Sequence, residues 1–174
     1  MPFAMSKDVR IALTGFMGVG KSSVARHLEH ITGCRRVDLD ALIEESSGRE
    51  IGEMIDTDGT EAFRLVESEV LKRVLEDENG CVLSLGGGTW TIPRNRELIR
   101  EHRFTSVWLE SSFDHCWYNL KFSRKERPLA RDKEAARALF EERQRSYCLA
   151  DWHFVVQSGL TSFDIAQQIA EQVL

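Results

Sequence analysis

The chain has 174 residues, of which 42% are hydrophobic and 29% charged, and its formal net charge at pH 7 is −5. A chain of this length suits one domain, and the composition is typical neither of a disordered chain nor of a membrane protein. The acidic balance argues against a dedicated nucleic-acid binder, which normally carries a strong basic excess. We therefore expect one soluble globular domain that binds neither nucleic acid nor a membrane.

Apolar runs bounded by turn residues predict strands near 9–14, 35–39, 81–85, 104–109 and 153–156. Helical patterns follow the first strand, to about residue 31, and recur over 61–75, 94–101, 111–122, 133–149 and 162–173. This alternation predicts an α/β fold, a five-stranded parallel sheet flanked by helices.

The predicted single domain, 1–174, has connections longer than a simple crossover between two pairs of strands. We expect a core of about 8–39, 79–118 and 133–174. Extra helical material occupies about 40–78, and a polar, basic segment occupies about 119–132. Long insertions are usually functional when they cover a site, and a site in such a sheet lies at the carboxyl ends of the strands.

A phosphate-binding loop follows the first predicted strand. Gly15-Phe16-Met17-Gly18-Val19-Gly20-Lys21-Ser22 fits G-x-x-x-x-G-K-[ST], with a strand before it and a helix after it. Glycines let the backbone turn tightly and direct N–H groups at a phosphate. Lys21 is suited to the β- and γ-phosphates and Ser22 to Mg²⁺, so we predict a nucleoside triphosphate site; an ordinary glycine-rich turn is the alternative. The predicted nucleotide-binding residues are Gly15, Met17, Gly18, Val19, Gly20, Lys21, Ser22 and Ser23.

The second predicted strand ends in a pair of carboxylates, Asp38 and Asp40, which an extended chain would place on the same side, beside the phosphate loop. One carboxylate can hold the water shell of Mg²⁺, and the other can accept a hydrogen bond from a substrate hydroxyl. Helix capping by Asp40 is the alternative.

The third predicted strand runs into Gly86-Gly87-Gly88, where the backbone either approaches a ligand closely or turns sharply. Ser84 stands where many phosphate-loop enzymes carry a metal-binding acid. Further on, cations crowd into one short stretch, which suits a small polyanion, although a solvated helix face is the alternative. They are Lys121, Arg124, Lys125, Arg127, Arg131 and Lys133.

The cysteines, Cys34, Cys81, Cys116 and Cys148, lack the C-x-x-C spacing of a zinc site or redox pair. Reduced thiols in a cytoplasmic protein are the simplest interpretation, with Cys81 as a small core residue. The segment Met1–Met5 has no features of a signal peptide, and no stretch approaches the length of a membrane span.

The ordered set of motifs resembles the shikimate kinase family over nearly the whole chain. Its segments are the loop at 15–22, Asp38-Leu39-Asp40, Phe63-Arg64 with Glu67, the stretch 82–88, Arg127-Pro128-Leu129, and Arg143 four residues before Tyr147. The resemblance implies a P-loop fold like that of nucleoside monophosphate kinases, with 40–78 as a substrate-binding insertion and 119–132 as a lid. It also implies a monomeric cytoplasmic enzyme of chorismate and aromatic amino acid biosynthesis, which phosphorylates the 3-hydroxyl of shikimate with ATP and Mg²⁺.

Carried over by position, the resemblance implies residue roles. Lys21, Asp40 and Arg127 are the implied catalytic residues, Arg127 also binds the nucleotide as it closes over the phosphates, and Ser22 and Asp38 serve the metal. The residues implied to bind shikimate are Asp40, Arg64, Gly86, Gly87, Gly88 and Arg143. Arginines suit its carboxylate, and Asp40 suits its hydroxyls.

The chain departs from the family pattern near the expected adenine site. Leu120 stands where a basic residue is common, with Lys121 or Arg124 as possible substitutes, and 157–160 lacks the expected Asn and Arg. Arg145 is an alternative to Arg143. Other hypotheses are a gluconate or nucleoside monophosphate kinase, or a non-catalytic nucleotide-binding module, although the module should have lost Lys21, Asp40 or Arg127.

Overall fold

The computed structural model describes residues 9–77, 81–125 and 127–174. The segment Met1–Met5 and the expected core limits at 8 and 79 lie outside these residues. The strands are β1 (Arg10–Thr14), β2 (Arg35–Asp38), β3 (Cys81–Ser84), β4 (Thr105–Glu110) and β5 (Trp152–Val155). All pairings are parallel, in the order β2-β3-β1-β4-β5, so the prediction of a five-stranded parallel sheet is confirmed.

The sheet is most deeply buried at its centre. β3 is buried along its whole length, Cys81 included, and β1 is buried from Ile11 onward, while the edge strands β2 and β5 are half-buried or exposed. Helices cover both faces of a parallel sheet, which explains why the central strands are continuous apolar runs rather than alternating patterns.

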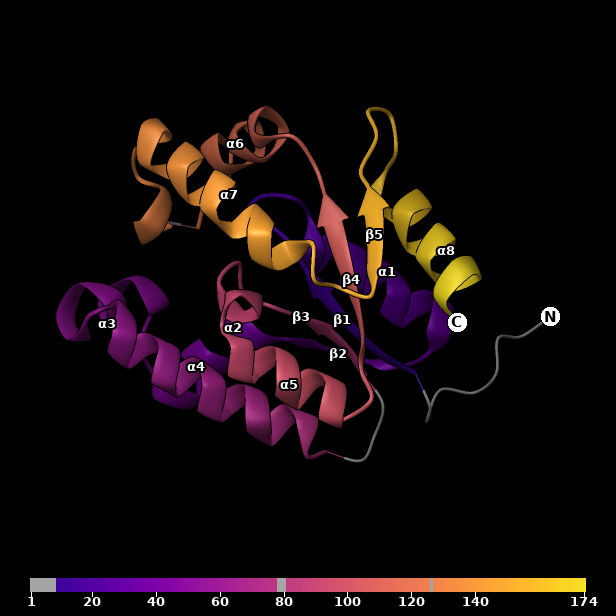
Figure 1. Ribbon diagram of the computed structural model, residues 1–174, viewed down its shortest axis with the longest axis horizontal. Coiled ribbons are helices and arrows are strands. Elements are labelled where there is room, and N and C mark those ends of the chain that lie inside the picture. The colour runs from indigo at the N-terminus through magenta and orange to yellow at the C-terminus, as the bar shows by residue number, and fades with distance from the viewer. Residues whose placement is uncertain (1–8, 78–80, 126) are drawn as a thin grey trace.

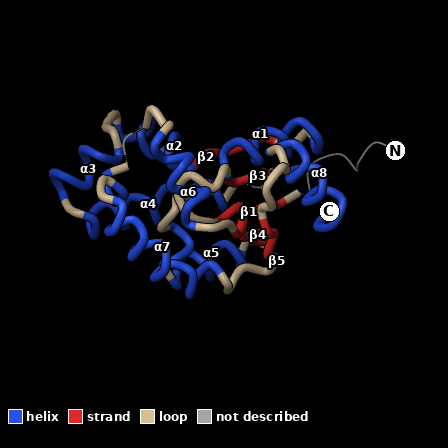
Figure 2. The backbone as a smooth tube through the Cα atoms, turned by 90° about the horizontal axis from the view of Figure 1, so that it is seen from above, coloured by secondary structure: helices blue, strands red, loops and turns tan. Residues whose placement is uncertain are grey.

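Helices lie on both faces of the sheet. On one face α1 (Lys21–Thr32) and α8 (Ser162–Val173) lie side by side, and on the other α5 (Pro93–Glu101) lies beside α4 (Thr60–Leu75) (Figures 1 and 2). α6 (Phe113–Lys121) and α7 (Lys133–Tyr147) lie near the carboxyl ends of the strands. No helix among the described residues combines the length and apolar character needed to cross a membrane.

The helical material predicted between the second and third strands forms α2 (Leu39–Ser47), α3 (Ile51–Asp58) and α4. α3 lies at the end of the molecule remote from α8 (Figure 2). The basic segment connects α6 to α7 and contains a 3-10 turn at Pro128–Ala130, so the alternative of a solvated helix face is wrong for most of it. We call residues 122–132 the lid segment, leaving out residue 126, which lies outside the described residues.

Candidate active site

The phosphate loop requires its glycines for two reasons. Gly15, Gly18 and Gly20 all have positive φ angles, which side chains rarely adopt. In addition, a Cβ atom at Gly15 would lie 2.8 Å from the carbonyl oxygen of Leu109, and one at Gly18 would lie 2.5 Å from that of Cys116. No side chain caps the helix that starts after Gly20, so its first N–H groups are available to an anion.

Lys21 is buried at the start of α1, where its ammonium group donates hydrogen bonds to the carbonyl oxygens of Gly15 (2.7 Å) and Phe16 (3.0 Å). Burial, followed by repulsion from Arg127, lowers the pKa of Lys21 from 10.5 to about 8, and Asp40 partly offsets this shift. The ammonium group of Lys21 is therefore a buried cation without a full countercharge beside the phosphate loop, which favours a polyanionic ligand.

The two predicted carboxylates do different jobs. Asp38 Oδ2 accepts a hydrogen bond from the Ser22 hydroxyl (2.7 Å), and Oδ1 accepts one from the N–H of Ala41 (3.2 Å), so Asp38 is the N-cap of α2. The capping alternative for Asp40 is therefore wrong. The expectation that both lie on one side of an extended chain is also wrong, because α2 begins at Leu39 and places Asp40 in its first turn.

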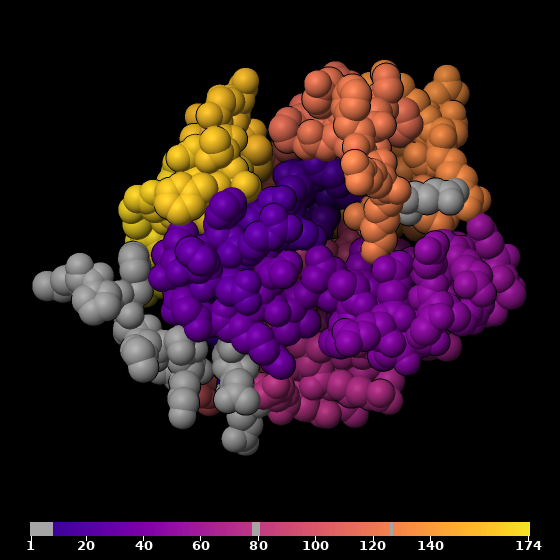
Figure 3. Space-filling model, turned by 180° about the vertical axis from the view of Figure 1, so that it is seen from behind, coloured from indigo at the N-terminus to yellow at the C-terminus, as the bar shows by residue number. Residues whose placement is uncertain are grey.

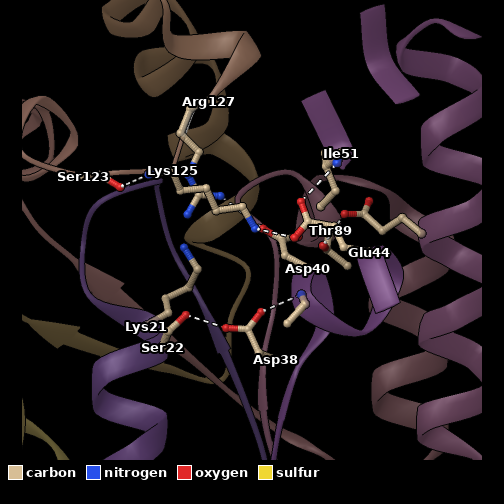
Figure 4. A network of polar contacts seen from close by, with 12 residues as sticks. Lys21, Ser22, Asp38, Asp40, Glu44, Ile51, Thr89, Ser123, Lys125 and Arg127 are labelled. Carbon is tan, nitrogen blue, oxygen red and sulfur yellow. Dashed lines mark hydrogen bonds and ion pairs between the residues drawn. The ribbon is translucent and has the colours of Figure 1, made fainter. Parts of the chain in front are cut away.

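Asp40 is consequently available to the lid segment. Arg127 Nη1 donates to Asp40 Oδ2 at 3.2 Å, and Figure 4 shows Lys21, Asp40 and Arg127 converging from three elements. Two more ion pairs tie the lid segment to the insertion, Lys125 with Glu44 (3.1 Å) and Arg131 with Asp56 (2.8 Å).

A cleft of about 410 Å³ opens above the phosphate loop. In Figure 3 it is the hollow between the indigo region and the orange segment that follows α6. Ser84 lies on its wall, and the sheet register pairs Ser84 with Asp38, so Asp38 stands beside the position of the missing acid. The residues that line the cleft include Met17, Gly18, Gly20, Lys21, Ser22, Ser23, Asp38, Asn119 and Leu120.

Some residues predicted for nucleotide binding do not line this cleft. Gly15 and Val19 belong to the loop but do not border the cleft. Leu120 does border it, whereas Lys121 and Arg124 are exposed and do not.

A second pocket adjoins the cleft and contains both predicted arginines. Arg64 is paired with Glu67 at 2.8 Å, and Glu67 also accepts a hydrogen bond from Thr89 Oγ1 at 2.7 Å. Burial raises the pKa of Glu67, although Arg64 and Thr89 oppose that shift. Arg143 is 6% exposed and lines the same pocket, whereas Arg145 is exposed outside it.

The glycine run allows side chains of the site to approach the backbone closely. A Cβ at Gly86 would lie 2.7 Å from Asp40 Oδ1, and one at Gly87 would lie 3.0 Å from Arg143 Nη1. At Gly88 it would lie 2.1 Å from Arg64 Nη2. Gly88 itself has φ −106°, which any residue adopts, so close approach rather than a sharp turn explains this glycine.

The pocket and the cleft share a wall. Met17, Asp40, Gly87 and Arg127 line both, so a group held in the pocket would face a group held in the cleft across Asp40 and Arg127. The pocket encloses about 50 Å³, well below the usual size of a ligand pocket, and the lid segment supplies part of its wall.

The structure brings to the site several residues for which the sequence predicts no role. Ile51 and Ile55 form an apolar wall of the pocket, and their i, i+4 spacing could have revealed a common helix face. Glu67 was part of a motif, but its burial beside Arg64 was not predictable from the motif. Asn119 lines the cleft without any sequence pattern that points to it.

Comparisons with known proteins show which family the chain resembles. The model of the shikimate kinase family matches residues 17–174. A shikimate kinase of Geobacter metallireducens is 40% identical over 169 residues, which cover 95% of this chain and 92% of that protein. One of Streptococcus thermophilus is 39% identical over 138 residues, covering 78% and 82%.

Solved structures agree as well. The shikimate kinase of Acinetobacter baumannii, in complex with shikimate, superposes with a TM-score of 0.88 at 29% identity, covering 96% of this chain and 94% of that one. A sugar kinase of Janibacter, 12% identical with a TM-score of 0.67, shares the fold alone. The matched length, the identities and the fold together show that this chain belongs to the shikimate kinase family.

Proposed function

We propose that this protein transfers the γ-phosphoryl group of ATP to the 3-hydroxyl of shikimate, giving shikimate 3-phosphate and ADP. The observation that carries the proposal is the wall shared by the two pockets, because phosphoryl transfer needs donor and acceptor face to face. Membership of the family supports it, and so does the Acinetobacter relative in complex with shikimate.

On the donor side, the phosphate loop would hold the triphosphate with its N–H groups and Lys21. The Ser22 hydroxyl and the carboxylate of Asp38, 2.7 Å apart, form a donor set of the oxygen ligands that Mg²⁺ prefers. Mg²⁺, when bound, would neutralise charge on the phosphates. Ser22 would serve as its ligand, and Asp38 would accept hydrogen bonds from its waters.

On the acceptor side, Arg64 and Arg143 would bind the carboxylate of shikimate through their planar guanidinium groups. Glu67 would keep Arg64 in place, and Ile51 and Ile55 would pack against the ring. Asp40 would accept the proton of the 3-hydroxyl. At the same time the hydroxyl oxygen of shikimate would form a bond to the γ-phosphorus, and the bond between the γ-phosphorus and the leaving ADP oxygen would break.

Arg127 would add positive charge where the phosphoryl group passes between donor and acceptor. It lies on the lid segment, which we propose to open for substrate entry and to close over the filled site. The ion pairs from the lid segment to α2 and α3 support this role.

We also propose that the protein acts as a monomer in the cytoplasm. A single chain lines both pockets, so no residue from another copy is required. Cys148 is an exposed free thiol, which is typical of a reducing compartment. We likewise propose the predicted division into a core, an insertion at about 40–78 and a lid at about 119–132.

An assay of ADP release tests the activity. The purified protein is incubated with Mg²⁺ and ATP, and with shikimate, gluconate or a nucleoside monophosphate in turn. We expect ADP release to require shikimate and the product to be shikimate 3-phosphate. Release with gluconate or a monophosphate but not with shikimate would disprove the proposed substrate, and release with none of them would favour a non-catalytic module.

The Gly88→Ala substitution should weaken shikimate binding selectively. The three atoms nearest to the new Cβ all belong to the end of the flexible Arg64 side chain, so we expect Arg64 to shift while the backbone stays in place. We expect the KM for shikimate to rise about tenfold or more, as for the loss of a charged hydrogen bond, with the KM for ATP unchanged.

Gly33→Ala provides the matched control. Gly33 has φ 70° with open space around its Cβ position, so alanine should cost about 1 kcal/mol of stability through backbone strain and leave both KM values unchanged. An unchanged KM for shikimate in the Gly88 variant would remove the Arg64 contact from the binding site.

The affinity for MgADP should depend on the charge of Lys21. In the free protein its pKa is about 8, so Lys21 is protonated below that pH, and above it binding must take up a proton. We therefore expect a constant Kd up to about pH 8 and a rise approaching tenfold per pH unit above it. Calorimetric titrations between pH 7 and 9.5, in buffers of different ionisation enthalpy, would measure both Kd and proton uptake.

Lys21→Arg is the control, because its guanidinium stays charged over this range. Its Kd, whatever its value at pH 7, should not change with pH. A flat profile for the native protein, or the same slope in both proteins, would show that another group controls the affinity.

A further inference from the structure

The side chain of Asn119 contacts the phosphate loop from a distant part of the chain. Its Nδ2 donates a hydrogen bond to the carbonyl oxygen of Gly18 at 2.7 Å across a separation of 101 residues. His115 Nε2, one turn earlier on α6, lies 3.2 Å from the same nitrogen. Asn119 and Gly18 both line the nucleotide cleft, so this contact lies at the edge of the site.

Hydrogen bonds hold the Gly18–Val19 peptide unit at both ends. The N–H of Val19 donates to the carbonyl oxygen of Phe16 at 3.3 Å, and the carbonyl of Gly18 accepts the shorter bond from Asn119. Gly18 has φ 80°, and glycine can rotate about its backbone bonds with little steric cost. The Asn119 bond is therefore the stronger restraint on a peptide that could otherwise reverse.

The direction of this peptide matters for an anion. The N–H of Val19 is bonded within the loop to the Phe16 carbonyl, so this peptide does not itself donate to a phosphate, but a reversed peptide would present the negative end of its carbonyl dipole to the phosphates. Asn119 fixes the Gly18 carbonyl on the α6 side. By holding the Gly18–Val19 peptide in this direction, the side-chain amide of Asn119 favours the loop conformation that binds phosphate.

Close packing of α6 on the loop makes the restraint effective. A Cβ at Gly18 would lie 2.5 Å from the carbonyl oxygen of Cys116 and 3.0 Å from Leu120 Cγ, so helix and loop are in direct contact. α6 leads into the lid segment that carries Arg127. The Asn119 bond therefore lies where the loop, the cleft and the base of the lid meet.

We propose that Asn119 is a positioning residue for the nucleotide, acting through the Gly18–Val19 peptide. The inference rests on the proposed function for its kinetic consequences, but its effect on nucleotide binding can be measured separately. Asn119 does not line the acceptor pocket, so its loss affects nucleotide binding rather than shikimate binding.

The test compares Asn119→Ala and Asn119→Asp with the native protein. Calorimetry gives the Kd for MgADP, steady-state kinetics gives both KM values, and thermal unfolding gives Tm. For Asn119→Ala we expect the Kd for MgADP and the KM for ATP to rise about tenfold, as for the loss of one hydrogen bond in a site. The KM for shikimate at saturating ATP stays unchanged.

Asn119→Asp should bind MgADP more weakly than Asn119→Ala. A carboxylate cannot donate to the Gly18 carbonyl, and it adds negative charge beside the phosphates. Gln144→Ala is the matched control, because Gln144 Nε2 also donates to a backbone carbonyl, that of Phe140 at 3.3 Å, but lines neither pocket. It should leave the Kd for MgADP unchanged.

An unchanged Kd for MgADP in Asn119→Ala would overturn the proposal. It would also be overturned if Tm fell and both KM values rose together, because that pattern indicates a structural role only. MgADP binding needs no acceptor, so the calorimetric result decides the role of Asn119 even if the native protein fails to phosphorylate shikimate. That failure would instead refute the proposed function.

Discussion

Arg127→Ala is expected to lower kcat on the order of 10³-fold, in the range of an arginine that stabilises a phosphoryl-transfer transition state, while the KM for shikimate changes little. Arg127 lines both pockets and lies 3.2 Å from Asp40, so its charge is placed at the junction between donor and acceptor. Charge at that point would stabilise the transferring group more than either bound substrate. Steady-state kinetics at saturating ATP would measure the split between kcat and KM.

Arg131→Ala controls for a general disturbance of the lid segment. Arg131 pairs with Asp56 on the exposed side of that segment, and exposed pairs contribute little. Its kcat should stay within about twofold of the native value. Equal losses in the two variants, or a native kcat in Arg127→Ala, would remove the specific catalytic role from Arg127. Arg127→Lys keeps the charge without the planar guanidinium group, so its kcat should lie between those of Arg127→Ala and Arg131→Ala.

The Asp40→Asn substitution is expected to lower kcat by about 10²-fold to 10⁴-fold with the fold intact, which is the usual contribution of a general base. An amide keeps the shape of the carboxylate but cannot accept the hydroxyl proton. The structure explains why the fold should survive, because Asp38 rather than Asp40 caps α2. Kinetics and thermal unfolding on the same preparation would measure both effects.

Asp56→Asn is the corresponding control, since it removes an ion pair between the insertion and the lid segment away from the shared wall. It should leave kcat close to native. Near-normal turnover in Asp40→Asn would mean that Asp40 only holds Arg127. The double variant of Asp40 and Arg127 completes a thermodynamic cycle, and we expect strongly non-additive losses because the two side chains are in contact.

The sheet was predictable because its physical causes are local. The central strands are buried on both faces and therefore appear as apolar runs bounded by turn residues. The phosphate loop was also predictable, because its positive φ angles and backbone contacts can be met only by glycine. At these positions the backbone conformation calls for glycine, and at Gly15 and Gly18 the carbonyl oxygens of Leu109 and Cys116 also leave no room for a side chain.

The division of labour between Asp38 and Asp40 was not predictable in the same way. Either residue could cap a helix, and the choice depends on the residue at which β2 ends and α2 begins. Assignments of a helix end differ by a residue or two, and here the hydrogen bond from the Ala41 N–H to Asp38 identifies the cap. The hydrogen bond of Asn119 to Gly18 depends wholly on tertiary packing, because it joins an isolated asparagine to a loop 101 residues away.

The same short segment that caps α2 also lies between the two proposed ligand sites. Asp38 holds Ser22 on the donor side, and α2, which it starts, carries Asp40 on the acceptor side. If a ligand at one site shifts either residue, the free energy of binding at the other site changes with it. By thermodynamic linkage, the factor by which the nucleotide alters affinity for the acid must equal the factor by which the acid alters affinity for the nucleotide.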